Sequence, residues 1–251
     1  VVSNKFVYFG EYWYDNGGLP SILVNYLKTH ELNIFEYLDK DKFLKVSSDD
    51  FKNPTALTTI NQNVLMCQTG YLTLRSDLNK TSTVALGIPN GEIYKALNRL
   101  LANNIFKGNT DITDDYGRSL LEVGTVDDII NLFNSALNSV SYDNYPIVSE
   151  SSVQNMLKLY LLGAHQKVLS EVHEAKGRAD LVVNTDNRRI VFEFKYAKNE
   201  TEAKSKLHDA VEQIKTRDYG NIVPNKTELL RIAAVFNADP KVRAFTEFQL
   251  V

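Results

Sequence analysis

Two short segments of the sequence place acidic and basic side chains where they could act on one substrate. Residues 177–183 contain Asp180, and residues 189–195 contain Glu193 and Lys195. Paired carboxylates suit a hard divalent ion such as Mg²⁺ or Mn²⁺, which can lower the pKa of a bound water and stabilise charge on a phosphate group. A lysine beside such an ion could orient the water or neutralise the phosphate. The three residues therefore indicate metal-assisted hydrolysis of a phosphodiester.

The local pattern predicts how these side chains meet. Successive side chains of a strand point to opposite faces, so Val191, Glu193 and Lys195 share one face, and the last two lie about 7 Å apart along it. Residues 184–188 are polar and suit a tight hairpin turn, which makes the two strands antiparallel and brings Asp180 close to Glu193. An alternating strand is also typical of a sheet edge with a solvated face. The chemical interpretation therefore depends on the three residues together.

The elements around these segments alternate between apolar runs and amphipathic helices. We expect helices at residues 150–162 and 200–217, and strands at residues 168–174, 178–184, 189–195, 229–236 and 245–251. This order predicts an α/β fold whose sheet has mixed strand directions.

The first part of the chain has a different pattern. It predicts helices at residues 17–38, 54–66, 93–101 and 119–137, and a hairpin of strands at residues 71–75 and 84–88. A hairpin among helices suggests a mostly helical, winged-helix-like accessory domain. The polar segment 139–149, which contains Pro146, is the expected boundary, and we place the two domains at residues 1–145 and 146–251.

Composition and charge limit the classes of protein that fit. The chain is 43% hydrophobic with a net charge of −3, and we find neither an apolar run of about 20 residues nor a signal-like start. The lone Cys67 cannot form an internal disulfide, so we expect a cytoplasmic protein without a membrane partner. Residues 150–251 carry 16 Lys and Arg against 14 Asp and Glu, so this half is the better place for a polyanion to bind.

Three motifs together resemble a known superfamily. They are the Gly-Arg-Ala-Asp run at residues 177–180, Phe-Glu-Phe-Lys at residues 192–195, and the Gln-Ile-x-x-Arg-x-Tyr run at residues 213–219. They resemble the PD-(D/E)XK nucleases, and above all the nuclease-like domains attached to bacterial AAA-ATPase-like proteins. Ala179 replaces the usual proline of the first motif. The resemblance implies a restriction-endonuclease-like mixed sheet flanked by helices.

The resemblance also implies roles for individual residues. The catalytic residues would be Asp180, Glu193, Lys195 and Gln213, and the ligands of Mg²⁺ or Mn²⁺ would be Asp180, Glu193 and Glu150. Nucleic acid would be bound by Arg178, Arg217 and Tyr219.

The first part carries its own resemblance. The Gln-Thr-Gly-Tyr-Leu-Thr run at residues 68–73 and the Ile-Pro-Asn-Gly-Glu run at residues 88–92 are similar to motifs at the end of the AAA-ATPase-like part of those proteins. The sequence lacks the G-x-x-x-x-G-K-[ST] motif that holds nucleotide phosphates. We therefore expect no ATP binding by this chain, which resembles the C-terminal part of such a protein.

These observations predict a Mg²⁺-dependent nuclease that acts on DNA. The alternative is a catalytically silent domain of the same fold that binds nucleic acid or a protein partner within a larger ATPase-like protein. An intact set of Asp180, Glu193 and Lys195 favours catalysis, because a binding domain does not need two carboxylates beside a phosphate path.

Overall fold

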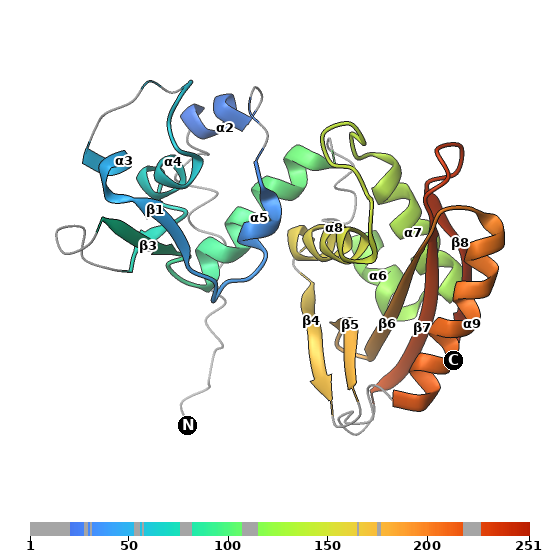
Figure 1. The fold of residues 1–251 in the computed structure, drawn as a ribbon. Helices are drawn as coiled ribbons and strands as arrows, with labels where there is room; N and C mark the ends of the chain where they lie inside the picture. The colour runs from blue at the N-terminus through green and yellow to red at the C-terminus, as the bar shows by residue number, and fades with distance from the viewer. Residues whose placement is uncertain are drawn as a thin grey trace, which may run out of the picture. The chain divides into compact units, whose positions relative to one another are not determined.

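A computed structural model describes residues 21–27, 30, 32–52, 56, 58–75, 82–106, 115–164, 166–174, 177–217 and 227–251 (Figure 1). The chain forms two compact units, Val1–Leu97 and Asn98–Val251.

The first unit contains short helices and a small antiparallel sheet. Its described elements are α2 (Ser21–Leu27), the 3-10 helix η1 (Ile34–Tyr37), β1 (Leu44–Ser47), α3 (Ser48–Lys52), α4 (Gln62–Gln68), β2 (Thr73–Leu74), β3 (Thr83–Gly87) and the start of α5 (Gly91–Ile105). The sheet has the strand order β1-β3-β2. One of its faces is buried through Leu44, Val46, Val84 and Leu86, as expected for a sheet that covers a small core.

The hairpin of β2 and β3 agrees with the sequence analysis, but two predicted helices differ. The predicted helix 17–38 is helical over α2 but is wrong as one continuous helix, because Asn33, just before the 3-10 helix η1, has non-helical backbone angles. The predicted helix 54–66 begins only at Gln62, because the side chain of Asn61 caps the helix by accepting a hydrogen bond from the Asn63 N–H. That helix stops at Gly70, whose φ of +86° suits glycine.

The second unit is an α/β fold. Its elements are α6 (Asp115–Val123), α7 (Val126–Asn138), α8 (Glu150–Gly163), β4 (Lys167–Glu174), β5 (Gly177–Asn184), β6 (Arg188–Ala197), α9 (Glu200–Arg217), β7 (Glu228–Asn237) and β8 (Ala244–Leu250). The five strands lie in the order β4-β5-β6-β7-β8. Only the β6–β7 pair is parallel. The predicted mixed sheet flanked by helices, consistent with a restriction-endonuclease-like fold, is thus confirmed.

Helices cover both faces of the central strand β6. Val191 packs with Ala210 and Ile214 of α9 in one buried cluster. On the opposite face Phe192 lies against Phe133 of α7, with ring centroids 5.3 Å apart. Figure 1 shows α9 lying along the sheet near β7 and β8. Strand β6 is therefore a buried central strand and not a solvated edge, so its charged residues sit in a dry environment.

Helices α6 and α7 are fastened to the sheet by polar contacts. The Asn134 side chain of α7 accepts the Phe245 N–H at 2.8 Å and donates to the Phe245 carbonyl at 3.1 Å. Arg188 in turn donates to the carbonyl of Gly124, just after α6, at 2.6 Å. These contacts place residues 115–138 with the sheet, whereas the sequence analysis drew the boundary near residue 145.

The single predicted helix over residues 119–137 is two helices in the structure. Gly124 and Thr125 separate α6 from α7, and Thr125 caps α7 through a reciprocal pair of hydrogen bonds with Asp128. A capping box starts a new helix because it satisfies backbone N–H groups that have no partner in the first turn. Among the described helices, none has both the length and the apolar character needed to cross a bilayer.

We predict that residues 91–251 fold alone and residues 146–251 do not. The longer piece keeps α5 to α7, whereas the shorter one exposes Phe192 and leaves the backbone groups of Phe245 without the Asn134 amide. Circular dichroism and thermal melting of both pieces would check this. In the longer piece Asn134→Ala should lower the free energy of unfolding by about 1–3 kcal/mol. A cooperative melt of residues 146–251 near that of the longer piece would contradict the prediction.

Candidate active site

The register of β5 and β6 brings Asp180 next to Glu193. The antiparallel ladder pairs Leu181 with Phe192, so Asp180 and Glu193 occupy the next positions along the two strands. At this point the Asp180 carboxylate accepts the Phe194 N–H at 2.8 Å. The Asp180 side chain thus takes the place of a backbone acceptor for the Phe194 N–H. This bond fixes one carboxylate oxygen of Asp180 against β6.

Glu193 is a fully buried carboxylate with two different oxygens. Its Oε1 accepts a hydrogen bond from the Lys195 ammonium at 2.7 Å, and the exposed fraction of its side chain is 0%. Its Oε2 is also buried, and within the described part of the chain no group donates to it. An unpartnered buried carboxylate oxygen is costly. This atom is therefore the strongest indication that the site receives something from outside the chain.

Lys195 lies between two carboxylates. Besides its bond to Glu193, its ammonium is 3.6 Å from the Glu150 carboxylate. Glu150 is the first residue of α8, whose N-terminus is capped by the Ser149 hydroxyl. Burial lowers the pKa of Lys195, but the hydrogen bond to Glu193 and the surrounding carboxylates outweigh it and raise that pKa overall. Lys195 is therefore held as an ammonium ion in the site.

Gln154 is a site residue that the sequence analysis did not identify. Its side chain acts as a hydrogen-bonding neighbour that lowers the pKa of Asp180, and it lies one turn after Glu150 on α8. Residues four apart on a helix share a face, so α8 directs Glu150 toward Lys195 and Gln154 toward Asp180. The spacing from Glu150 is the signal in the sequence that could have identified this glutamine.

The two carboxylates resist ionisation together. Burial, followed by the nearby Asp180 charge, raises the pKa of Glu193 to about 7, although Lys195 opposes the shift. Burial also raises the pKa of Asp180, against the hydrogen bond from Phe194 and the charge of Lys195. Like charges that share a desolvated site hold on to protons in this way. A cation beside them would relieve that repulsion.

The donor set fits a hard divalent ion, with Asp180 and Glu193 as its core. Both offer oxygen ligands, and the free Oε2 of Glu193 could bind an ion while Oε1 keeps its bond to Lys195. Over the described residues, no three His, Cys, Asp or Glu side chains are already gathered as a ligand set. Oxygen sites for Mg²⁺ commonly use one or two carboxylates, with water and substrate as the other ligands.

The remaining predicted residues lie around this core. Gln213 is half-buried on α9 and makes no hydrogen bond to Asp180, Glu193 or Lys195, all of which are described. Arg178 is exposed on β5. The Arg217 side chain crosses β5 at Gly177, where an added Cβ would lie 2.6 Å from Cδ of the arginine. Tyr219 lies outside the described residues.

We predict that Glu193 makes the metal-free protein more stable at lower pH. Its pKa is about 7 in the folded chain and near 4.5 unfolded, so the folded state binds the proton more tightly. That stabilisation is full below pH 4.5 and is lost as the pH rises through 7, on the order of 3 kcal/mol in all. Denaturant unfolding in a chelator from pH 5 to 8 should show this fall in the wild type and a flatter profile in Glu193→Gln.

An exposed carboxylate supplies the matched control. Glu200 has its pKa lowered by the hydrogen bond from Lys204, so Glu200→Gln should keep the fall in stability between pH 5 and 8. If the free energy of unfolding fell with pH by the same amount in the wild type and in Glu193→Gln, the effect could not be assigned to Glu193.

Comparisons with known proteins agree with this geometry over part of the chain. No curated protein matches the sequence. A family model does, and its span contains Glu150, Gln154, Asp180, Glu193 and Lys195. Residues 148–246 match the PD-(D/E)XK nuclease superfamily.

Proposed function

We propose that the second unit is a metal-dependent nuclease that hydrolyses phosphodiester bonds of DNA. The observation that carries the proposal is Glu193, a buried carboxylate with one oxygen on Lys195 and the other without a partner among the described residues. Asp180 stands beside it with a raised pKa. Strongly perturbed pKa values cluster at functional sites, so two perturbed carboxylates beside a lysine support this assignment. The match of residues 148–246 to a superfamily whose members are usually nucleases supports the same reading.

Asp180 and Glu193 would hold Mg²⁺ or Mn²⁺, with Glu150 assisting at the edge of the ligand shell. When bound, the ion supplies a more acidic water and stabilises negative charge on the phosphate. The two carboxylates stand on neighbouring strands whose backbones are paired. The protein therefore orders its ligands before any ion arrives.

Lys195 would act on the phosphate or on the attacking water. Its ammonium is held by Glu193 at 2.7 Å and by Glu150 at 3.6 Å, so it stays charged and adjacent to the ligand oxygens. A fixed positive charge stabilises a phosphorane-like transition state more than it stabilises the substrate. Lys195 should therefore contribute to turnover more than to substrate affinity.

The other predicted residues would contact the nucleic acid. Gln213 lies on the helix over the Glu193 face of β6, so we assign it to the substrate or to a water. Arg178, Arg217 and Tyr219 would bind the strand outside the metal site. Phosphate contacts of this kind position a strand without reading its sequence.

The first unit would connect the nuclease to a larger assembly. Its sequence motifs resemble the end of an AAA-ATPase-like domain, and the family match does not extend to it. We propose that it orients the nuclease unit or binds a partner in the cytoplasm, and that this chain itself binds no ATP.

The metal assignment predicts a loss of ion binding in two isosteric variants. Asp180→Asn keeps an oxygen for the Phe194 N–H, and Glu193→Gln keeps the shape of the buried side chain, but each removes a negative ligand. Calorimetric titration with Mn²⁺ should show affinity at least tenfold weaker in each, or about 1.4 kcal/mol. Thermal melting in chelator should show both variants folded. Unchanged Mn²⁺ affinity in both would refute the assignment.

The catalytic assignment predicts that Lys195→Met is folded but slow. With plasmid and single-stranded DNA in Mg²⁺, turnover should fall by about 10²–10³-fold, while the DNA dissociation constant changes little. The matched control is Lys204→Met, because Lys204 is exposed on α9 and forms its ion pair with Glu200. Equal losses of binding and turnover would instead make Lys195 a plain phosphate contact. A wild-type chain that binds DNA and Mn²⁺ without cleavage would favour the silent binding domain.

A further inference from the structure

Arg243 stands in a backbone conformation that does not favour arginine. It closes the turn between β7 and β8 with φ of +45°, the only described non-glycine residue with positive φ. The Asp239 carbonyl accepts the N–H groups of Val242 and Arg243 at 2.8 and 3.0 Å. Glycine or asparagine would meet this conformation at lower cost. The arginine side chain therefore has to be explained by what it does.

The guanidinium of Arg243 is held rigidly. Its central carbon lies 3.6 Å from the centre of the Tyr142 ring, a close cation–π contact. Tyr142 is itself fixed, because its hydroxyl donates to the Ile147 carbonyl at 2.6 Å. The Nε atom of Arg243 is buried and has no hydrogen-bond partner in the described part of the chain.

The outer end of the same guanidinium has no partner within the part of the chain that the structure describes. Its two terminal nitrogens are not among the buried unpartnered atoms, and the described residues offer Arg243 neither a hydrogen bond to the side chain nor an ion pair. An immobilised arginine whose terminal nitrogens have no partner among the described residues suits a two-oxygen anion. Exposed apolar side chains of Val148 and Val242 lie in the two segments that meet here, with exposed fractions of 62% and 41%.

This receptor lies at the end of the sheet where β6 and β7 finish. The segment from Tyr142 to Ile147 leads directly to Glu150, which faces Lys195. Across the sheet, Ala197 pairs with Asn237 and Asn237 pairs with Ala244, the neighbour of Arg243. Two strand spacings, roughly 10 Å, therefore separate this end of β6 from the arginine.

We infer that the free end of Arg243 is a subsite for a backbone phosphate of the nucleic-acid strand bound at Asp180, Glu193 and Lys195. This inference rests on the proposed nuclease function and adds a substrate contact to it. The phosphate would lie outside the scissile position, so Arg243 would hold the strand in place and take no part in bond cleavage. Tyr142 serves as the platform that keeps the guanidinium in position.

The test is the salt dependence of DNA binding by the full chain. A single-stranded oligodeoxythymidylate with cleavage-resistant phosphorothioate links is titrated at fixed Mg²⁺ over roughly 50–200 mM salt, with fluorescence anisotropy as the readout. Arg243→Gly removes the guanidinium and relieves the backbone strain, so it should stay folded. We expect it to bind about tenfold more weakly at low salt. The slope of log affinity against log salt should fall in magnitude by about 0.7, the value for one phosphate contact on a single strand.

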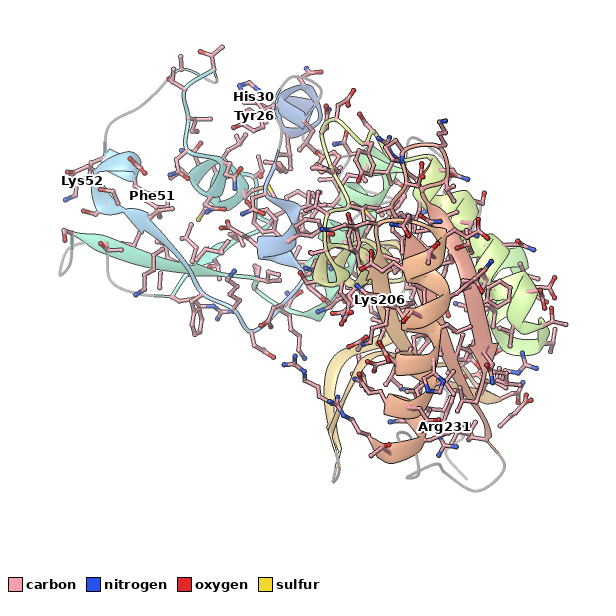
Figure 2. All side chains as sticks on the ribbon, turned by 45° about the vertical axis from the view of Figure 1, so that its right-hand side comes forward. Tyr26, His30, Phe51, Lys52, Lys206 and Arg231 are labelled. Atoms are coloured by element: carbon pink, nitrogen blue, oxygen red, sulfur yellow. The ribbon has the colours of Figure 1, made fainter. Side chains whose placement is uncertain are left out.

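Three further variants sharpen the result. Arg243→Lys should bind DNA more weakly but keep the salt slope of the wild type. Its charge remains, but lysine lacks the planar guanidinium. Tyr142→Leu should do the same, because the guanidinium is present but no longer fixed. Lys52→Gln, at an exposed lysine of the first unit paired with Asp49, should match the wild type in both quantities; Figure 2 labels Lys52 on its short helix.

The outcomes separate this inference from the proposed function. A wild-type slope in Arg243→Gly, with a wild-type chain that binds and cleaves DNA, overturns the subsite alone. Weaker binding with an unchanged slope also overturns it, since a purely structural role for Arg243 would give that result. A wild-type chain that neither binds nor cleaves DNA defeats the proposed function and the subsite with it.

Discussion

The buried ion pair of Glu193 and Lys195 is the constraint on which the second unit depends. A carboxylate with no exposed surface on a central strand is costly unless a cation compensates it. Lys195, on the same strand, supplies this cation, and its ammonium lies 2.7 Å from the Glu193 carboxylate. Helices cover both faces of β6 around the pair. The burial that makes the charged pair costly to desolvate also strengthens every charge interaction within it. The same dry surroundings give Glu193 a pKa of about 7.

Helix α8 connects this pair to the rest of the fold. Glu150 lies 3.6 Å from the Lys195 ammonium and Gln154 lowers the pKa of Asp180, so one face of the helix serves both halves of the site. Its orientation is set at its first turn by the Ser149 cap, and Val153 and Leu157 are fully buried on it. The positions of the carboxylates are therefore determined by core packing as well as by strand pairing. Such support is what a site needs when its ligands must be ordered before an ion binds.

The sequence predicted the parts of this arrangement that depend on local periodicity. Strand β6 and helix α9 could be placed because alternation and a helical stripe are strong signals, and the turn at residues 184–188 set the register of Asp180 against Glu193. The first unit was harder, since helix starts such as Gln62 depend on a single capping side chain. Residues 139–149 look like a linker in the sequence, but the contacts of Asn134 with Phe245 bind α7, which precedes them, to the sheet. Arg243 gave no signal, because its φ and its contact with Tyr142 exist only in three dimensions.

Lys195 also determines how the site can respond to a cation. A cluster of carboxylates alone would have to bind protons or an ion to remain folded, but here Lys195 already neutralises Oε1 of Glu193. An arriving ion therefore meets Oε2, which is buried and unpartnered among the described groups, and need not displace the lysine. The bound ion and Lys195 would then share the Glu193 carboxylate, which keeps the lysine ammonium next to the ion. The two oxygens of Glu193 thus have different roles: one holds the Lys195 ammonium in place, and the other remains available for chemistry.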